Sequence, residues 1–283
     1  MTGGPTNFTL APDIAQADTR HGPLFVLKSD NTIGRSLLTY GEWTEGEIGV
    51  LRQALRPNDC IVDVGANIGS HTIALAKAVL PGGCIMAFEP HPKVFQLLSA
   101  NVVVNGLSNV RLYPNACGAE AGMLWFPDLD YSLETNYGAL QVSELRSLHH
   151  SIKKQVSQPV PIVILDDVYD LPALRLVKID VEGMEVDFLK GAERTIRRFR
   201  PMLYIENEYP QSSEQLLCAL RDLDYIAYWH VVPLFNPDNF RRATENVFSD
   251  IACINNVCVP KELGLEVTGF QKVTDLNQHP RRT

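Results

Sequence analysis

Residues 60–72 read CIVDVGANIGSHT, an apolar run followed by a turn that contains two glycines. The run from Cys60 to Val64 has the length and composition of a parallel strand that is buried on both faces. Gly65 and Gly69 let the backbone turn tightly and approach a ligand, and the helix that follows offers free N–H groups at its start. The dinucleotide pattern G-x-G-x-x-G requires glycine where this chain has Asn67. The stretch therefore predicts a strand, a turn and a helix beneath a ligand that is not a dinucleotide.

Strand-like and helix-like segments alternate after this turn. Cys84–Phe88 and Val110–Tyr113 read as strands, and Pro92–Asn105 between them has apolar residues at helical spacing. This order predicts βαβ units and a parallel sheet. The alternation resumes in the second half of the chain, where the last two strand candidates read as an antiparallel pair, residues 225–229 and 250–255. We therefore expect an α/β fold, with a Rossmann-like, mostly parallel sheet, an antiparallel last strand and helices on both faces.

Three regions follow from this pattern. We expect an N-terminal extension and cap over residues 1–58, a main domain over residues 59–259, and a C-terminal tail over residues 260–283. The alternation breaks between about residues 118 and 163, which we interpret as a small β insertion rather than a separate domain. Its strand candidates are Met123–Phe126, Ala139–Val142 and Val160–Ile164.

The composition excludes several classes of protein. The formal net charge of −8 argues against a broad basic surface for nucleic acid or an anionic membrane. No apolar run approaches the ~18 residues that span a bilayer, and no secretory signal is visible. The six cysteines lack zinc-ligand spacing. We therefore expect a cytoplasmic protein without a metal and without a nucleic-acid or membrane partner.

Acidic residues end the first two predicted strands. Asp63 suits a ligand that carries an ammonium group, and Glu89 is placed to accept hydrogen bonds from two ribose hydroxyls. Together within one βαβ unit they predict an adenosine-type ligand. The alternative for Glu89 is an acid that balances the dipole of the following helix.

Three blocks of sequence resemble one family. VDVGANIGSHT at residues 62–72, FEPHP at 88–92 and KIDVEGME at 178–185 stand in the order found in the FkbM family of methyltransferases, and the similarity runs from about Gly41 to Glu206. It includes the pairs Asp166–Asp167 and Gly191–Ala192. The resemblance implies a class I methyltransferase fold, S-adenosylmethionine as methyl donor, and O-methylation of a hydroxyl on a sugar or a natural-product intermediate.

The same resemblance implies a set of donor-binding residues. The methionine end would be lined by Asp63, Gly65, Asn67 and Gly69, the ribose would be held by Glu89, and the adenine edge would lie against Asn115 and Ala116. We assign three further residues to this site: Ser70, Pro90 and Asp180.

A hydroxyl acceptor must lose its proton, which requires a general base or a metal that acidifies the hydroxyl. Lys178, Asp180 and Glu182 alternate along one side of a strand end, where buried charges are costly unless they are paired or functional. Asp180 is the preferred catalytic carboxylate, Glu206 is the second candidate, and His230 is a third base near the expected acceptor entrance. The alternative is an internal ion pair between Lys178 and one carboxylate.

Several alternatives stay open. Asp180, Glu206 and Asn207 could together bind Mg²⁺, although their spacing does not demand it. An N-methyltransferase, a catalytically silent S-adenosylmethionine-binding protein and a nicotinamide-dependent oxidoreductase are the competing functions. The expected partner is a small-molecule acceptor, and the sequence does not decide between a monomer and a homodimer.

Overall fold

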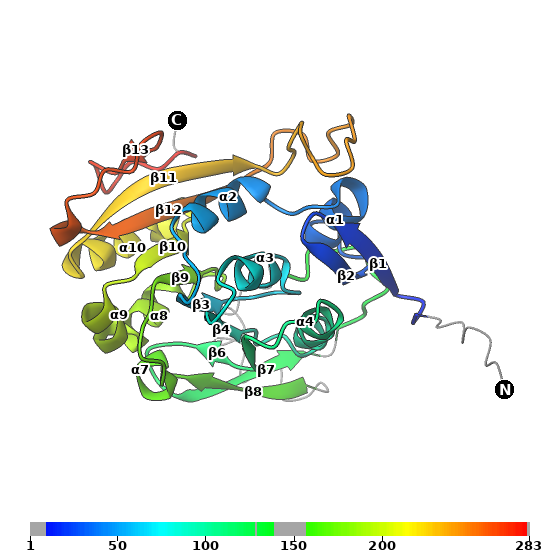
Figure 1. Ribbon diagram of the computed structural model, residues 1–283, viewed down its shortest axis with the longest axis horizontal. Coiled ribbons are helices and arrows are strands. Elements are labelled where there is room, and N and C mark those ends of the chain that lie inside the picture. Colours follow the sequence, from blue (N-terminus) through cyan, green and yellow to red (C-terminus); the bar gives the residue numbers. More distant parts are fainter. Residues whose placement is uncertain (1–9, 128, 139–156, 282–283) are drawn as a thin grey trace.

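A computed structural model describes residues 10–127, 129–138 and 157–281 (Figure 1). The predicted strand Ala139–Val142 lies outside these residues. One sheet of eight strands forms the centre of the molecule, in the order β13-β11-β12-β10-β9-β3-β4-β5. The strands are β3 (Cys60–Val64), β4 (Cys84–Phe88), β5 (Val110–Tyr113), β9 (Leu176–Ile179), β10 (Met202–Glu206), β11 (Tyr225–Pro233), β12 (Ala252–Pro260) and β13 (Gln271–Lys272).

The five strands from β5 to β10 run parallel to one another. β12 lies between β10 and β11 and is antiparallel to both, so β11 returns to the direction of β10. The chain order reverses at β3, which has β4 on one side and β9 on the other. Ligands bind at such switch points, at the carboxyl ends of the strands. The predicted fold class, a Rossmann-like α/β fold whose mostly parallel sheet has an antiparallel last strand, is confirmed.

Two layers of helices cover the sheet because its strands are apolar on both faces. All five residues of β3 are buried. Ile61 packs with Leu75 and Leu98 in one core, whereas Val62 packs with Phe188 in the other. The first core contains residues of α2 (Glu45–Gln53), α3 (Ser70–Ala78) and α4 (Pro92–Val104), and the second contains residues of α8 (Glu185–Gly191), α9 (Glu193–Phe199) and α10 (Pro210–Asp222).

The N-terminal cap packs against α4. It consists of the hairpin β1 (Ile14–Thr19) and β2 (Gly22–Leu27) and the helix α1 (Ile33–Tyr40). Asn101 on α4 is fully buried, and its side chain bonds the N–H and C=O of Phe25 and the C=O of Ile68 at 2.6–3.0 Å. One side chain thereby connects the cap, α4 and the turn after β3.

The insertion forms a separate small sheet in the order β6-β8-β7. Its strands are β6 (Ala116–Cys117), β7 (Gly122–Pro127) and β8 (Ser157–Val163), and the short helix α7 (Leu165–Val168) follows. β7 and β8 match two of the predicted strands.

The C-terminal region forms part of the central sheet. It contains the 3-10 helix η1 (Lys261–Leu263) and β13, and β13 pairs with β11, so the region predicted as a tail contributes a strand to the central sheet. Within the described residues, every helix is too short or too polar to traverse a lipid bilayer.

Candidate active site

A cavity of about 330 Å³ opens at the carboxyl ends of the parallel strands. The turn after β3 forms one wall, Glu89 after β4 lies at one end, and Asp180 after β9 and Glu206 at the end of β10 lie on another side. Segments far away in sequence complete the wall. The lining residues from these segments include Thr32, Ile33 and Trp43 near the cap, Tyr137 from the insertion, Cys253 from β12 and Arg281 from the C-terminal region.

The glycines of the β3–α3 turn are required by packing. Gly65 has a φ of +76°, and a Cβ there would lie 1.7 Å from the carbonyl oxygen of Asp180, because the end of β9 crosses the turn. Gly69 has a φ of +92°, and a Cβ would lie 2.8 Å from Leu98 Cδ1. Gly65 lines the cavity, but Gly69 does not. Gly69 therefore allows α3 to approach α4, and its contact with a ligand stays a prediction.

Asp63 also has a structural position that differs from the prediction. Its side chain is fully buried, accepts a hydrogen bond from Thr72 Oγ1 at 2.6 Å, and lies 3.6 Å from Lys178 Nζ. It does not line the cavity. Asp63 therefore pairs with Lys178 and holds the first turn of α3, and its contact with a ligand ammonium group stays a prediction.

Glu89 presents a buried carboxylate to the cavity. The Asn67 N–H donates to Oε2 at 2.9 Å and the His91 N–H donates to Oε1 at 2.8 Å. Each oxygen keeps a second lone pair for another donor. Burial raises the pKa of Glu89 to about 7, against the opposing effect of these two backbone donors. The two backbone donors fix the carboxylate, which could accept hydrogen bonds from two neighbouring hydroxyls.

The other predicted donor-binding residues lie around Glu89 and the turn. Asn67 adopts a left-handed conformation with a φ of 50°, and its own Oδ1 accepts from the next N–H, that of Ile68, at 2.7 Å. The structure brings together on the cavity wall Gly65, Asn67, Ser70, Glu89, Pro90, Asn115, Ala116 and Asp180. Their contacts with a ligand stay predictions.

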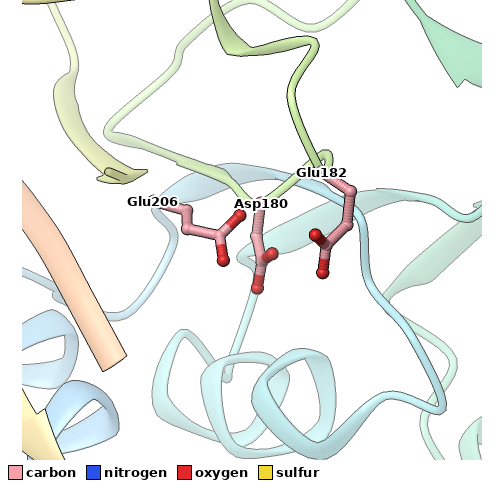
Figure 2. Close-up of side chains that lie close together, drawn as sticks. All are labelled: Asp180, Glu182 and Glu206. Carbon is pink, nitrogen blue, oxygen red and sulfur yellow. The ribbon is translucent and has the colours of Figure 1, made fainter. Parts of the chain in front are cut away.

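Three acidic side chains meet at the opposite side of the cavity. Asp180, Glu182 and Glu206 each have a carboxylate oxygen within 4.8 Å of the others, and Figure 2 shows the side chains turned toward one another. Asp180 is 42% exposed and lies 3.3 Å from Lys178 Nζ, whose positive charge stabilises negative charge on Asp180. Tyr209 donates to Glu182 at 3.0 Å. Asp180 is therefore both reachable from the cavity and electrostatically supported.

Protons or a cation must reduce the repulsion in this group. Burial, followed by the nearby Asp180, raises the pKa of Glu182 to about 8 and holds the pKa of Glu206 well above its ordinary value. The group could also hold a divalent cation, because its oxygens suit Mg²⁺ or Ca²⁺. The set differs from the one considered in the sequence: Asn207 is buried and donates to Asn256 at 2.7 Å, and Glu182 takes its place.

His230 is separated from this chemistry. Its Nδ1 lies 2.9 Å from the Tyr204 hydroxyl, and its ring packs edge-on against Phe270 at 4.8 Å. It is buried and does not line the cavity. The position of His230 on β11 directs the ring into the packing beside the sheet, and its role as a base stays a prediction.

Arg281 from the C-terminal region was absent from the predicted site. No local motif marks it, because its position depends on contacts between segments distant in sequence. His71 and His91 could have been selected from their places beside the turn and beside Glu89. Both rings line the cavity, and His71 Nε2 lies 3.2 Å from the buried carboxylate of Glu47.

Comparisons with known proteins identify the family of this chain. A family model described as the methyltransferase FkbM domain matches residues 63–230. The chain is 30% identical over 151 residues to "Methyltransferase 1" of Beauveria bassiana, which covers 48% of this chain and 60% of that protein. It is 32% identical over 163 residues to 31-O-demethyl-FK506 methyltransferase FkbM of Streptomyces tacrolimicus, with coverages of 49% and 61%.

A third relative and a solved structure extend the comparison. Hexuronic acid methyltransferase AglP of Haloferax volcanii is 26% identical over 194 residues, covering 66% of this chain and 71% of that protein. The crystal structure of methyltransferase FkbM from Methylobacillus flagellatus is 19% identical, with a TM-score of 0.43, over 71% of this chain and 44% of that one. The chain spans about 60% of the length of the first curated relatives that it matches. The FkbM domain nevertheless accounts for more than half of the chain, and the chain belongs to the FkbM family of methyltransferases.

Proposed function

We propose that this protein is an S-adenosylmethionine-dependent O-methyltransferase that acts on a hydroxyl of a small, oxygen-rich molecule such as a sugar or a natural-product intermediate. The observation that carries the proposal is the single cavity that joins the Glu89 carboxylate to the acidic group around Asp180. The names of two relatives, one for 31-O-demethyl-FK506 and one for a hexuronic acid, support an acceptor of this class.

The residues at the donor end fit S-adenosylmethionine. Glu89 has two free lone pairs for the ribose hydroxyls, and Ser70 begins α3, whose free N–H groups suit the carboxylate of the amino-acid moiety. Asp180 offers negative charge toward the sulfonium end of the cavity. The bound donor supplies a methyl group on a positively charged sulfur. Glu89, Ser70 and Asp180 would hold it at three points, and such fixed positioning is what an in-line displacement requires.

The acceptor end provides a base for the hydroxyl proton. Asp180 accepts this proton as the acceptor oxygen forms its bond to the methyl carbon, and the electrons of the broken carbon–sulfur bond stay with sulfur. Protonated Glu206 and Glu182 keep the site from carrying three negative charges, and Lys178 balances the charge of Asp180 before the transfer. General-base catalysis of this kind contributes about 10²- to 10⁴-fold in rate.

The experiment that tests the proposal follows labelled methyl groups. The full chain is incubated with S-[methyl-³H]adenosylmethionine and one candidate acceptor in each reaction. The acceptors are hexuronic acids, hydroxylated macrolides and amines of similar size. We expect label on oxygen. We also expect Asp180→Asn to lower kcat by about 10²- to 10⁴-fold. Asp187→Asn, a change on α8 outside the cavity lining, is the matched control and should keep the wild-type rate.

Three other outcomes would overturn parts of this proposal. Label on nitrogen, with little effect of Asp180→Asn, would replace O-methylation by N-methylation, because an amine loses its proton more easily. Binding of the donor without transfer to any acceptor would favour a silent S-adenosylmethionine-binding protein. Loss of activity on chelation and its recovery with Mg²⁺ would mean that a bound cation, and not protonation of Glu182 and Glu206, offsets the negative charge of the group.

A further inference from the structure

The cavity has an apolar side next to its acidic group. This side, which we call the apolar wall, is formed by Trp43, Leu234, Ile251, Ala252 and Cys253. Trp43 and Cys253 pack against the buried cluster that contains Leu234, and Ile251 is 55% exposed although it is a large aliphatic side chain. An aliphatic surface that faces an open cavity gains free energy when an apolar part of a ligand covers it.

Backbone hydrogen bonds hold the apolar wall beside the acidic group. Leu234 follows β11 directly, and its N–H donates to the carbonyl oxygen of Ile251 at 3.0 Å. β12 starts at the next residue and pairs with β10, which places Asn255 opposite Glu206. A ligand whose hydroxyl lies against the acidic group therefore has the apolar wall on its β12 side.

The cationic side chains of the described lining are already paired with carboxylates. Its lysine and arginine side chains are Lys178 and Arg281. Lys178 Nζ lies 3.6 Å from Asp63 Oδ1 and 3.3 Å from Asp180 Oδ2, and Arg281 forms an ion pair with Glu208. A carboxylate that loses its hydration needs such a cation as a partner. An acidic ligand would therefore meet carboxylates and an apolar surface in this part of the cavity.

We propose that the acceptor is an uncharged molecule whose hydroxyl is flanked by alkyl groups, and that the apolar wall selects it over acidic sugars. The inference rests on the proposed function, because it assumes a donor whose sulfonium lies at Asp180. It deepens that function, since it favours an alkyl-substituted natural-product intermediate over a hexuronic acid. An ammonium group on the acceptor is disfavoured for a different reason, because the sulfonium already brings a positive charge to this end of the cavity.

Four cyclohexanols that share one ring and one hydroxyl test the selection by charge. They carry a methyl group (trans-4-methylcyclohexanol), a carboxylate (trans-4-hydroxycyclohexanecarboxylate), the methyl ester of that acid, or an ammonium group (trans-4-aminocyclohexanol). Ligand-observed NMR gives the Kd of each compound for the full chain saturated with S-adenosylmethionine. We expect the methyl compound and the ester to bind at least tenfold more tightly than the carboxylate, and more tightly than the ammonium compound.

Each other outcome of this comparison is decisive. Equal or tighter binding of the carboxylate would overturn the inference, and so would tightest binding of the ammonium compound. If the complex with S-adenosylmethionine bound none of the four compounds, the inference would be wrong while the donor site would stand. If the chain did not bind S-adenosylmethionine, the proposed function itself would fail.

Ile251→Ser tests the apolar wall. Because the Ile251 side chain is more than half exposed, its loss should leave the fold intact, which circular dichroism verifies. The Kd for trans-4-methylcyclohexanol should rise about threefold or more, since less apolar surface is covered on binding. Leu265→Ser is the matched control, because Leu265 is 53% exposed and does not line the cavity, and its Kd should equal that of the wild type. An unchanged Kd in Ile251→Ser would overturn the role of the apolar wall.

Glu208→Gln tests the pairing of Arg281. The amide keeps an oxygen for the Ile254 N–H, which donates to Glu208 at 3.0 Å, but it no longer neutralises the guanidinium. The Kd of the carboxylate compound should fall about tenfold or more, because a free cation then faces the cavity. Glu262→Gln is the matched control: it frees Arg200 outside the cavity lining and should leave this Kd unchanged. An unchanged Kd in Glu208→Gln would overturn the inference that the pairing of the cations excludes acidic acceptors.

Discussion

Replacing Glu89 by glutamine tests the donor end of the cavity. Both carboxylate oxygens of Glu89 accept a backbone N–H, at 2.9 Å from Asn67 and 2.8 Å from His91, and both face the cavity with one lone pair free. In Glu89→Gln one oxygen becomes an NH₂ group, which cannot accept from a ribose hydroxyl. One charge-assisted hydrogen bond contributes about 1.5–3 kcal/mol. We therefore expect the Kd for S-adenosylhomocysteine to rise about 10- to 150-fold.

The pH dependence of the Kd for S-adenosylhomocysteine is an independent test of the role of Glu89. Burial raises the pKa of Glu89 to about 7. Because the ionised carboxylate is the stronger acceptor, the wild type should bind more tightly at pH 8 than at pH 6. In Glu89→Gln the Kd should change less between pH 6 and pH 8, because glutamine does not ionise. Lys178 and Asp180 are present in both proteins and therefore do not create the difference.

Isothermal titration calorimetry at pH 6, 7 and 8, with circular dichroism to verify folding, measures these effects. Glu42→Gln is the matched control, because Glu42 is also buried and accepts a backbone N–H, that of Phe240 at 2.8 Å, but does not line the cavity. Its affinity should match the wild type. A folded Glu89→Gln protein whose Kd changes less than about threefold would refute the role assigned to Glu89.

Three further predictions concern stability, measured by denaturant unfolding. Gly65→Ala should lower the free energy of unfolding by more than about 3 kcal/mol, because its Cβ would lie 1.7 Å from the Asp180 carbonyl oxygen. Gly49→Ala is the control: no atom lies within 4 Å of its Cβ, and the free energy of unfolding should rise by up to about 1 kcal/mol. Asn101→Leu should lower it by about 2–4 kcal/mol, since three buried hydrogen bonds are lost; an unchanged value would contradict its role as a connector of the cap. The pKa of Glu182 is raised to about 8, so the folded chain binds more protons than the unfolded chain and its stability should fall as the pH rises from 5 to 8; Glu182→Gln should reduce this fall, and an identical pH profile would count against the raised pKa.

The fold could be predicted because its determining signals are local. β3 is an apolar run buried on both faces, and the glycine turn and α3 follow it directly. The antiparallel last strand also follows from the order of short apolar segments. By contrast, β13 has only two residues, both exposed, and its pairing with β11 has no sequence pattern of its own.

The site could be predicted in part for the same reason. Gly65, Glu89 and Asp180 follow strands directly, and parallel strands bring their carboxyl ends to one edge of the sheet. The positions of Asp63 and His230 away from the cavity lining could not be predicted, because strand residues alternate between faces and sequence alone did not fix which neighbour each would meet. Asp63 meets Lys178 and His230 meets Tyr204.

The acidic group illustrates a further limit of the sequence. Glu182 has a φ of 49°, a left-handed conformation that turns the backbone after β9 and brings its side chain toward Asp180. A non-glycine residue rarely adopts this conformation, and no pattern in the sequence predicts it at Glu182. The sequence therefore predicted Asp180 and Glu206 but not the three-membered group that they form with Glu182.

A crystal structure of the full chain with S-adenosylhomocysteine tests the central claim most directly, because the claim concerns where the donor lies. We expect the ligand in the cavity, with both ribose hydroxyls on the Glu89 carboxylate and the sulfur facing Asp180. A ligand whose ribose lies away from Glu89, or one bound outside the cavity, would contradict it.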